Sequence, residues 1–372
     1  MRRFIYITLA IMWLISCQKE SLSNSSSVDG APIYLSAITE HSTDTRAPYE
    51  YTSPNDGENG VLHAAIWASS FGNDNIGYTY PNPEPPLNGK NGVETNANQV
   101  AIHATADFDS NAPQLLNQAV YPMVGTTVFF VGLHPQSGWS VNTDANKANF
   151  TFNGSNDVMF APRIKGQYAQ SDDQVINAPQ LHFYHLLTWL KVRIKAEDAD
   201  AISAWGKITK MEISSNTKVE IDLSDKNSSA SAEVSEGEFN FSKCEFSTPG
   251  KLSLYKAGSD DEFVTPTNGY TMSTTSPQDI VAYVLCSPVD AVATTVVDSK
   301  DVTVPEYTLY IETENRRVEL PIDLKINDGA YYTGNTRGKH FTLNLTFKMG
   351  NTIIVTAQAE DWKLGGAGNV EL

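Results

Sequence analysis

The stretch "HFTLNLTFKMGNTIIVTAQAEDW" (340–362) decides the fold class of this chain. From Phe341 to Phe347 every second residue is apolar and the residues between them are polar, so an extended backbone has one apolar face. The sequence at Met349–Asn351 supplies a turn, after which the same two-residue period resumes. We therefore predict a β-hairpin with one buried face.

Other segments are predicted strands as well, most of them with the same two-residue period. They are "TTVFFVGL" (126–133), "NFTF" (149–152), "LTWLKVRIKA" (187–196) with Leu190, Val192 and Ile194 inward, and "TKVEIDL" (217–223) with Val219, Ile221 and Leu223 inward. A second hairpin is predicted in "EYTLYIETENRRVELPIDL" around Glu314–Asn315, with Tyr307, Leu309 and Ile311 on one arm and Val318 and Leu320 on the other.

Helical signals are few and short. They are "APQLLNQA" (112–119) and "AEDADAISAW" (196–205), where Asp198 is the candidate N-cap. Asn, Ser, Thr, Gly and Pro fall in clusters between the apolar segments, as is typical of an all-β protein. The predicted fold class is all-β, with a few short helices.

The length of 372 residues bears on the number of domains. Beyond an N-terminal leader about 350 residues remain, more than one hydrophobic core comfortably holds, so we expect two domains. Near residue 178 the sequence changes from a loop-like composition to a clear strand pattern. We therefore expect the two domains to comprise residues 47–178 and 179–372. The Pro-, Gly- and Asn-rich segment 75–92 is expected to be a long surface excursion.

The first 17 residues, "MRRFIYITLAIMWLISC", have the layout of a secretory signal. The apolar run from Phe4 to Ile15 is too short to span a bilayer, and "LISC" has the form of a bacterial lipobox ending at Cys17. Roughly 30 buried acyl CH₂ groups at about 0.8 kcal/mol each make a two-chain anchor firm. An ordinary signal peptide with an incidental cysteine is the alternative. The segment 18–46 is expected to contain a serine-rich tether, "SLSNSSS" (21–27), and then a removable strand.

Composition and motifs exclude several classes of function. The formal net charge of −17 argues against nucleic acid partners, because phosphate binding needs clustered Lys and Arg. The sequence contains no H-E-x-x-H, G-x-S-x-G, phosphate-loop or C-x-x-C motif. His182 and His185 lie three residues apart, which places them on opposite faces of a strand and not around one metal ion. We predict no enzyme, no catalytic residue, no metal site and no cofactor.

Some residues keep two interpretations. The acidic segments "SPNDGENG" and "AGSDDEF" are solvated turns or calcium loops of irregular spacing. Cys244 and Cys286 are free or form a disulfide. Four tryptophans either belong to the core or stack on sugars: Trp139, Trp189, Trp205 and Trp362.

The stretch "IYLSAITEHSTDTRAP" (33–48) places a short strand before a polar, protease-accessible segment. Ile33, Leu35 and Ala37 form one face of that strand, and Arg46 precedes Ala47 in the polar part. Removing a paired strand exposes backbone donors and acceptors together with an apolar slot. A strand from another chain would refill that slot by strand addition, and head-to-tail contacts of this kind produce filaments.

In order along the chain, five features are similar to the fimbrillin family, which builds type V pili on certain Gram-negative anaerobes. They are the lipobox, Arg46, "NDVMFA" (156–161), "LHFYHLLTWLKVRI" (181–194) and the terminal hairpin with its "AEDW" ending. The resemblance implies two transthyretin-like β-sandwich domains and export to the outer-membrane surface as a lipoprotein on Cys17. It also implies cleavage between Arg46 and Ala47 by an arginine-specific surface protease, loss of the strand, and polymerisation with other fimbrial subunits by donor-strand exchange.

The role within such a fimbria stays open at this point. The short glycine-rich tail 363–372 leaves stalk, tip and anchor roles possible. The resemblance implies that tip subunits lack a donor extension and that anchor subunits escape the cut. A lipid-anchored surface protein that binds a host or other glycan through exposed aromatic residues is the competing function.

Overall fold

The computed structural model describes part of the chain. It comprises residues 32–39, 62–70, 102–108, 114–120, 127–142, 147–167, 179–223, 244–259, 261–265, 267–275, 279–290, 293–297, 300–304, 306–324, 332–350 and 352–361. Within these ranges no helix has both the length and the apolar character needed to cross a membrane.

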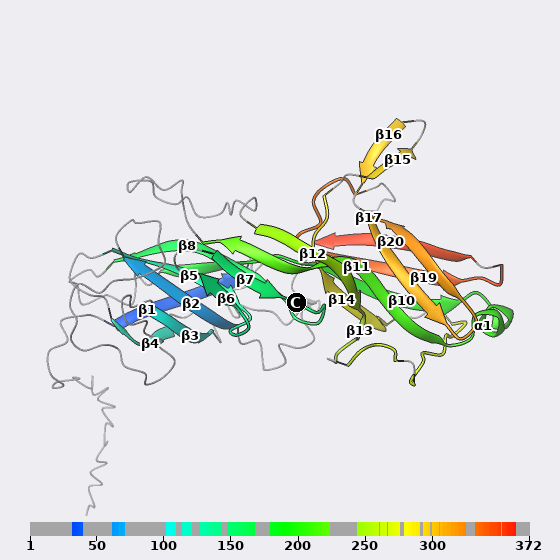
Figure 1. The fold of residues 1–372 in the computed structure, drawn as a ribbon, viewed down its shortest axis with the longest axis horizontal. Helices are drawn as coiled ribbons and strands as arrows, with labels where there is room; N and C mark the ends of the chain where they lie inside the picture. Colours follow the sequence, from blue (N-terminus) through cyan, green and yellow to red (C-terminus); the bar gives the residue numbers. More distant parts are fainter. Residues whose placement is uncertain are drawn as a thin grey trace, which may run out of the picture.

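The all-β fold class predicted from the two-residue period is confirmed, and the sheets are arranged as in a β-sandwich, as the resemblance implied (Figure 1). A seven-stranded sheet occupies one end of the molecule, in the order β3-β2-β5-β8-β9-β1-β4. Its strands are β1 (Pro32–Thr39), β2 (Leu62–Ser70), β3 (Ile102–Phe108), β4 (Gln114–Val120), β5 (Thr127–His134), β8 (Met159–Gln167) and β9 (Gln180–His185).

Two further sheets build the other end. The five-stranded sheet comprises β13 (Tyr255–Lys256), β14 (Ala282–Cys286), β10 (Thr188–Ala196), β19 (Lys339–Phe347) and β20 (Ile353–Asp361). The six-stranded sheet comprises β18 (Arg317–Asp323), β17 (Glu306–Thr313), β11 (Ile208–Asp222), β7 (Lys147–Thr151) and β6 (Ser140–Asn142), with β12 (Cys244–Ser253) also paired to β11. β15 (Ala293–Val297) and β16 (Lys300–Val304) form a separate hairpin that extends from the body in Figure 1.

The two predicted hairpins are confirmed by their strand registers. β19 pairs antiparallel with β20 from Lys339↔Asp361 to Phe347↔Ile353, and β17 pairs with β18 in the same sense. The apolar face of β19 is buried as its period requires. Thr342 and His340, on the other face of β19, are buried as well, and the ring of Trp189 from β10 lies against His340 with centroids 5.8 Å apart.

The helix expected at 112–119 is wrong, because residues Gln114–Val120 form β4. Pairing with β1 outweighs the helical preference of a short Leu- and Gln-containing segment. The other expected helix is confirmed as α1 (Ala199–Trp205), where the side chain of Asp198 accepts a hydrogen bond from the Ala201 amide at 2.8 Å.

One apolar core runs between the five- and six-stranded sheets and continues toward the seven-stranded sheet. Its members include Val192 and Leu343 on one side, Ile213 and Leu309 on the other, and Leu133 from β5. Strand pairing crosses the expected domain division in both directions, since β7 pairs with β11 while β9 pairs with β8. The division at residue 178 therefore stays a prediction.

Candidate functional site

The candidate site is the position of β1 inside the seven-stranded sheet, where β1 lies between β4 and β9. Its first half pairs antiparallel with β4, through Tyr34↔Leu115 and Leu35↔Gln114. Its second half pairs parallel with β9, from Ser36↔Gln180 to Thr39↔Phe183. β1 therefore joins two strands that have no direct pairing with each other in the described residues.

The middle of β1 is buried on both of its faces. Leu35 is 1 % exposed and Ala37 is fully buried, which agrees with the predicted apolar face. Ser36 points to the opposite face and is still only 5 % exposed, and its amide donates to the Pro179 carbonyl at 3.1 Å. Removing β1 would leave a slot that accepts a large apolar residue followed by two small ones.

The wall of this slot on the β9 side is held rigidly. Phe183 is fully buried and lies so close to Gly132 that a Cβ at that glycine would overlap its ring. At the end of β9 the Nδ1 of His185 lies 2.6 Å from Oδ2 of Asp157, and the amide of Val158 donates to Oδ1 at 2.8 Å. Both side chains of the pair are almost completely buried.

The Asp157–His185 contact joins two of the sequence motifs given above, "NDVMFA" and "LHFYHLL". The order of the motifs was visible in the sequence, but the contact was not, because 28 positions separate the two residues and no period links them. The pair positions the strand beside β1 and is the part of the site that sequence reasoning missed.

The remaining predicted site residues fall in other parts of the chain. Cys17, Arg46 and Ala47 lie outside the described residues, as does the side chain of Ile33. In the sequence, Arg46 lies between the end of β1 at Thr39 and the start of β2 at Leu62.

The structure shows the surroundings of the two cysteines that were predicted to be either free or joined in a disulfide. Cys244 and Cys286 are free, and burial raises the pKa of the Cys286 thiol to about 12. The hydroxyl of Tyr307, whose pKa burial raises well above its ordinary value, donates to the Ser287 carbonyl at 3.0 Å. Such neutral, inward-facing groups are structural.

The aromatic and histidine candidates have structural positions too. Trp205 is fully buried, and the Trp139 indole donates to the Pro135 carbonyl at 2.9 Å. His182 stacks on Tyr184 with ring centroids 4.5 Å apart. Within the described part of the chain, no three His, Cys, Asp or Glu side chains converge on a metal position. The segment 75–92, Trp362 and the tail 363–372 lie outside the described residues.

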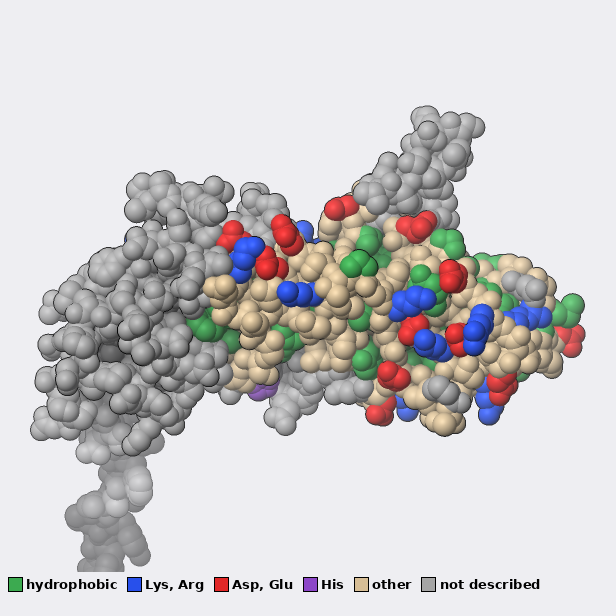
Figure 2. All heavy atoms as spheres, in the orientation of Figure 1, with side chains coloured by type: hydrophobic (Ala, Val, Ile, Leu, Met, Phe, Trp, Pro, Cys, Tyr) green, Lys and Arg blue, Asp and Glu red, His purple; other side chains and the backbone are tan. Residues whose placement is uncertain are grey.

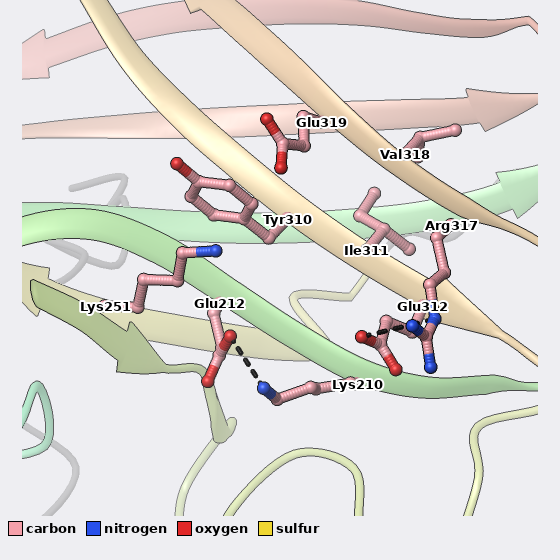
Figure 3. A pocket seen from close by; sticks show the side chains of 9 residues that line it. All are labelled: Lys210, Glu212, Lys251, Tyr310, Ile311, Glu312, Arg317, Val318 and Glu319. Atoms are coloured by element: carbon pink, nitrogen blue, oxygen red, sulfur yellow. Dashed lines mark ion pairs between the residues drawn. The ribbon is translucent and has the colours of Figure 1, made fainter.

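The outer face of the six-stranded sheet carries a hollow of about 360 Å³ (Figure 3). Four of its charged side chains form two ion pairs: Nζ of Lys210 lies 2.9 Å from Oε2 of Glu212, and Nε of Arg317 lies 3.5 Å from Oε1 of Glu312. The ammonium of Lys251 lies over the ring of Tyr310, 3.2 Å from its centroid. Acidic and basic residues are likewise interleaved on the face shown in Figure 2, which is typical of a solvated surface.

Comparisons with known proteins give likenesses among solved structures alone. No family model matches the chain. No curated protein matches it either. A structure of a protein assigned to cell adhesion, from Bacteroides uniformis, is 14 % identical and has a TM-score of 0.48, with 91 % of this chain and 100 % of that chain covered.

Two other likenesses are with proteins whose names refer to fimbriae. A fimbrial protein from Bacteroides vulgatus is 18 % identical with a TM-score of 0.37, covering 89 % of this chain and 99 % of that chain. A fimbrial assembly protein from Parabacteroides distasonis is 10 % identical with a TM-score of 0.38, covering 88 % and 95 %. At these identities and TM-scores the likenesses assign no function to this chain.

Proposed function

We propose that this chain is a structural subunit, stalk or tip, of a cell-surface fimbria. It is exported as a lipoprotein acylated on Cys17, cut between Arg46 and Ala47, and polymerised by exchange of β1 for a strand of another subunit. The observation that carries the proposal is the place of β1 between β4 and β9, with Leu35 and Ala37 buried.

The geometry of β1 supports removal and replacement as one process. After a cut at Arg46, only non-covalent contacts with β4 and β9 would hold β1 in the sheet. An empty slot loses about 1.5–3 kcal/mol for a large apolar side chain such as Leu35 and about 1 kcal/mol for each unmade ladder bond. These losses favour entry of a strand from a neighbouring subunit.

The proposal names three partners. The outer membrane holds the precursor through the lipid on Cys17, an arginine-specific surface protease makes the cut, and other fimbrial subunits supply and receive strands. The net charge of −17 makes a nucleic acid partner unfavourable.

The test is N-terminal sequencing of surface-extracted protein from cells that express the wild type, Arg46→Ala or Arg317→Ala. Arg317 is an exposed arginine on β18, away from β1, and serves as the matched control. We expect Ala47 as the first residue, and SDS-stable ladders, for the wild type and Arg317→Ala. Arg46→Ala is expected to leave membrane-bound monomers that start at the acylated Cys17.

Two results would count against the proposal. One is a ladder from Arg46→Ala that is as strong as the wild-type ladder. The other is wild-type protein that stays acylated on Cys17 and uncut, which would favour an anchor subunit or the lipid-held glycan-binding protein.

A further inference from the structure

A second hollow, of about 380 Å³, lies at the edge of the five-stranded sheet, between β13 and the segment that leads to β14. Its volume is within the range of small-molecule sites. Its lining differs from that of the hollow in Figure 3. Among the described residues, only one charged residue lines this second hollow, whereas several line the hollow in Figure 3. The lining residues are Lys256, Ala257, Phe263, Asn268, Gly269, Tyr270, Ile280 and Val281.

Backbone hydrogen bonds fix the walls of this hollow. The amide of Phe263 donates to the Leu254 carbonyl at 2.8 Å, and the amide of Tyr270 donates to the Ile208 carbonyl at 2.8 Å. The amide of Ala257 donates to the Val281 carbonyl at 3.2 Å. Each wall is thus tied to a strand or to its opposite wall, so the hollow is preformed.

Two aromatic rings form its apolar surface. The ring centroids of Phe263 and Tyr270 are 4.9 Å apart and their planes are inclined by 44°. Both side chains are partly buried and partly open to solvent, and burial raises the pKa of the Tyr270 hydroxyl. A tilted, half-exposed aromatic pair offers flat faces to a ligand that itself has a flat apolar face.

Polar groups sit at the rim. The side chains of Asn268 and Lys256 are exposed, and the position of Asn268 is fixed because its amide donates to the Thr265 carbonyl at 3.0 Å. An amide group both donates and accepts hydrogen bonds, while an ammonium donates three. The rim can therefore form hydrogen bonds with several hydroxyl groups of one ligand.

We propose that this hollow binds the ring of a neutral saccharide, with the C–H face of the sugar on Phe263 and Tyr270 and its hydroxyl groups on Asn268 and Lys256. The partial positive charge of sugar C–H groups complements the negative face of an aromatic ring. A neutral sugar also fits a chain of net charge −17 better than an acidic one, because like charges repel at long range. The site would serve adhesion and does not depend on removal of β1.

The experiment is saturation-transfer NMR on the purified chain with galactose, glucose, mannose, N-acetylglucosamine and sialyllactose as probes. We expect transfer to at least one neutral sugar, strongest at the protons of its apolar face. The variants Phe263→Ala, Tyr270→Ala and Asn268→Ala should each weaken that binding about tenfold, the effect of losing one stacked ring or a well-placed hydrogen bond.

Tyr310→Ala is the control, because it removes a partly exposed tyrosine from the other hollow and should leave sugar binding unchanged. Thermal unfolding of every variant separates lost binding from lost structure, and Asn268→Ala keeps the test valid if an aromatic variant fails to fold. The proposal is overturned if no neutral sugar shows transfer, if only sialyllactose binds, or if Asn268→Ala and a folded aromatic variant bind like the wild type.

Discussion

At the scale of single residues, the buried contact between Asp157 and His185 explains why two separate motifs occur together. The carboxylate accepts from the Val158 amide and contacts the imidazole at 2.6 Å, so it is bonded from two sides. A carboxylate in such a place is costly to bury unless all of its partners are present.

We therefore predict that Asp157→Ala lowers the free energy of unfolding by about 3 kcal/mol, because it leaves a buried imidazole and a backbone amide without their acceptor. Urea denaturation of the single variants and of the double variant with His185→Ala measures the coupling. Glu197→Ala is the control, since Glu197 forms an exposed ion pair with Lys348 and should change stability by less than about 1 kcal/mol. If Asp157→Ala and the control Glu197→Ala lowered the free energy of unfolding equally, the buried Asp157–His185 contact would not have the stabilising role assigned to it.

The predictions for individual residues succeeded where a period decides burial. Leu190, Val192 and Ile194 are inward as expected, because alternation on a strand leaves no other choice. Val318 and Leu320 are only partly buried, since they lie on β18 at the edge of its sheet. Ser36 is buried although it is polar, because strands flank β1 on both sides. Whether a strand lies at the edge of a sheet or inside it does not follow from the sequence of that strand alone.

At the scale of elements, the strand β4 shows that tertiary pairing can decide even the type of secondary structure. Its sequence, "QLLNQAV", contains good helix formers and no alternation, so local reasoning predicts a helix. It becomes a strand because β1 offers a complementary edge. In the described residues β1 is the only strand that pairs with β4.

This dependence leads to a prediction about cleaved monomers. After a cut at Arg46 and loss of β1, amide hydrogens of Gln114–Val120 should exchange faster by at least tenfold, because their ladder partner is gone. Hydrogen exchange with mass spectrometry, before and after cleavage, measures this, and β19 is the internal control because it pairs in another sheet. Unchanged protection of β4 in a monomer that has lost β1 would contradict the proposed slot.

At the scale of the whole molecule, charge governs how copies approach one another. Residues 1–46 carry four basic and four acidic side chains, so the cleaved chain keeps the entire net charge of −17. We predict that assembly of cleaved subunits, followed by light scattering, accelerates severalfold as ionic strength rises from about 0.01 to 0.15 M, because the Debye length falls from roughly 30 to 8 Å.

Uncleaved protein under the same conditions is the control and should not assemble. Slower assembly at higher salt would mean instead that specific opposite charges steer the subunits together.

The order of strands in the sheets is the property of the whole molecule that the sequence could not provide. Its period indicates which segments are strands, but β1 lies next to β9 across more than a hundred residues, and nothing local specifies that neighbour. The sequence predicted the removable strand and the cleavage position after Arg46. That β4 and β9 flank this strand became visible only in the three-dimensional structure.

The 15-residue strand β11 has a mechanical consequence. One end pairs with β17 and the other with β7, and β12 runs along it, so a single backbone bridges the waist of the molecule (Figure 1). Hydrogen bonds across antiparallel strands lie perpendicular to them, so tension along β11 would shear many bonds together and not peel them one at a time. In the proposed fibre, this arrangement would make each subunit resist extension along β11.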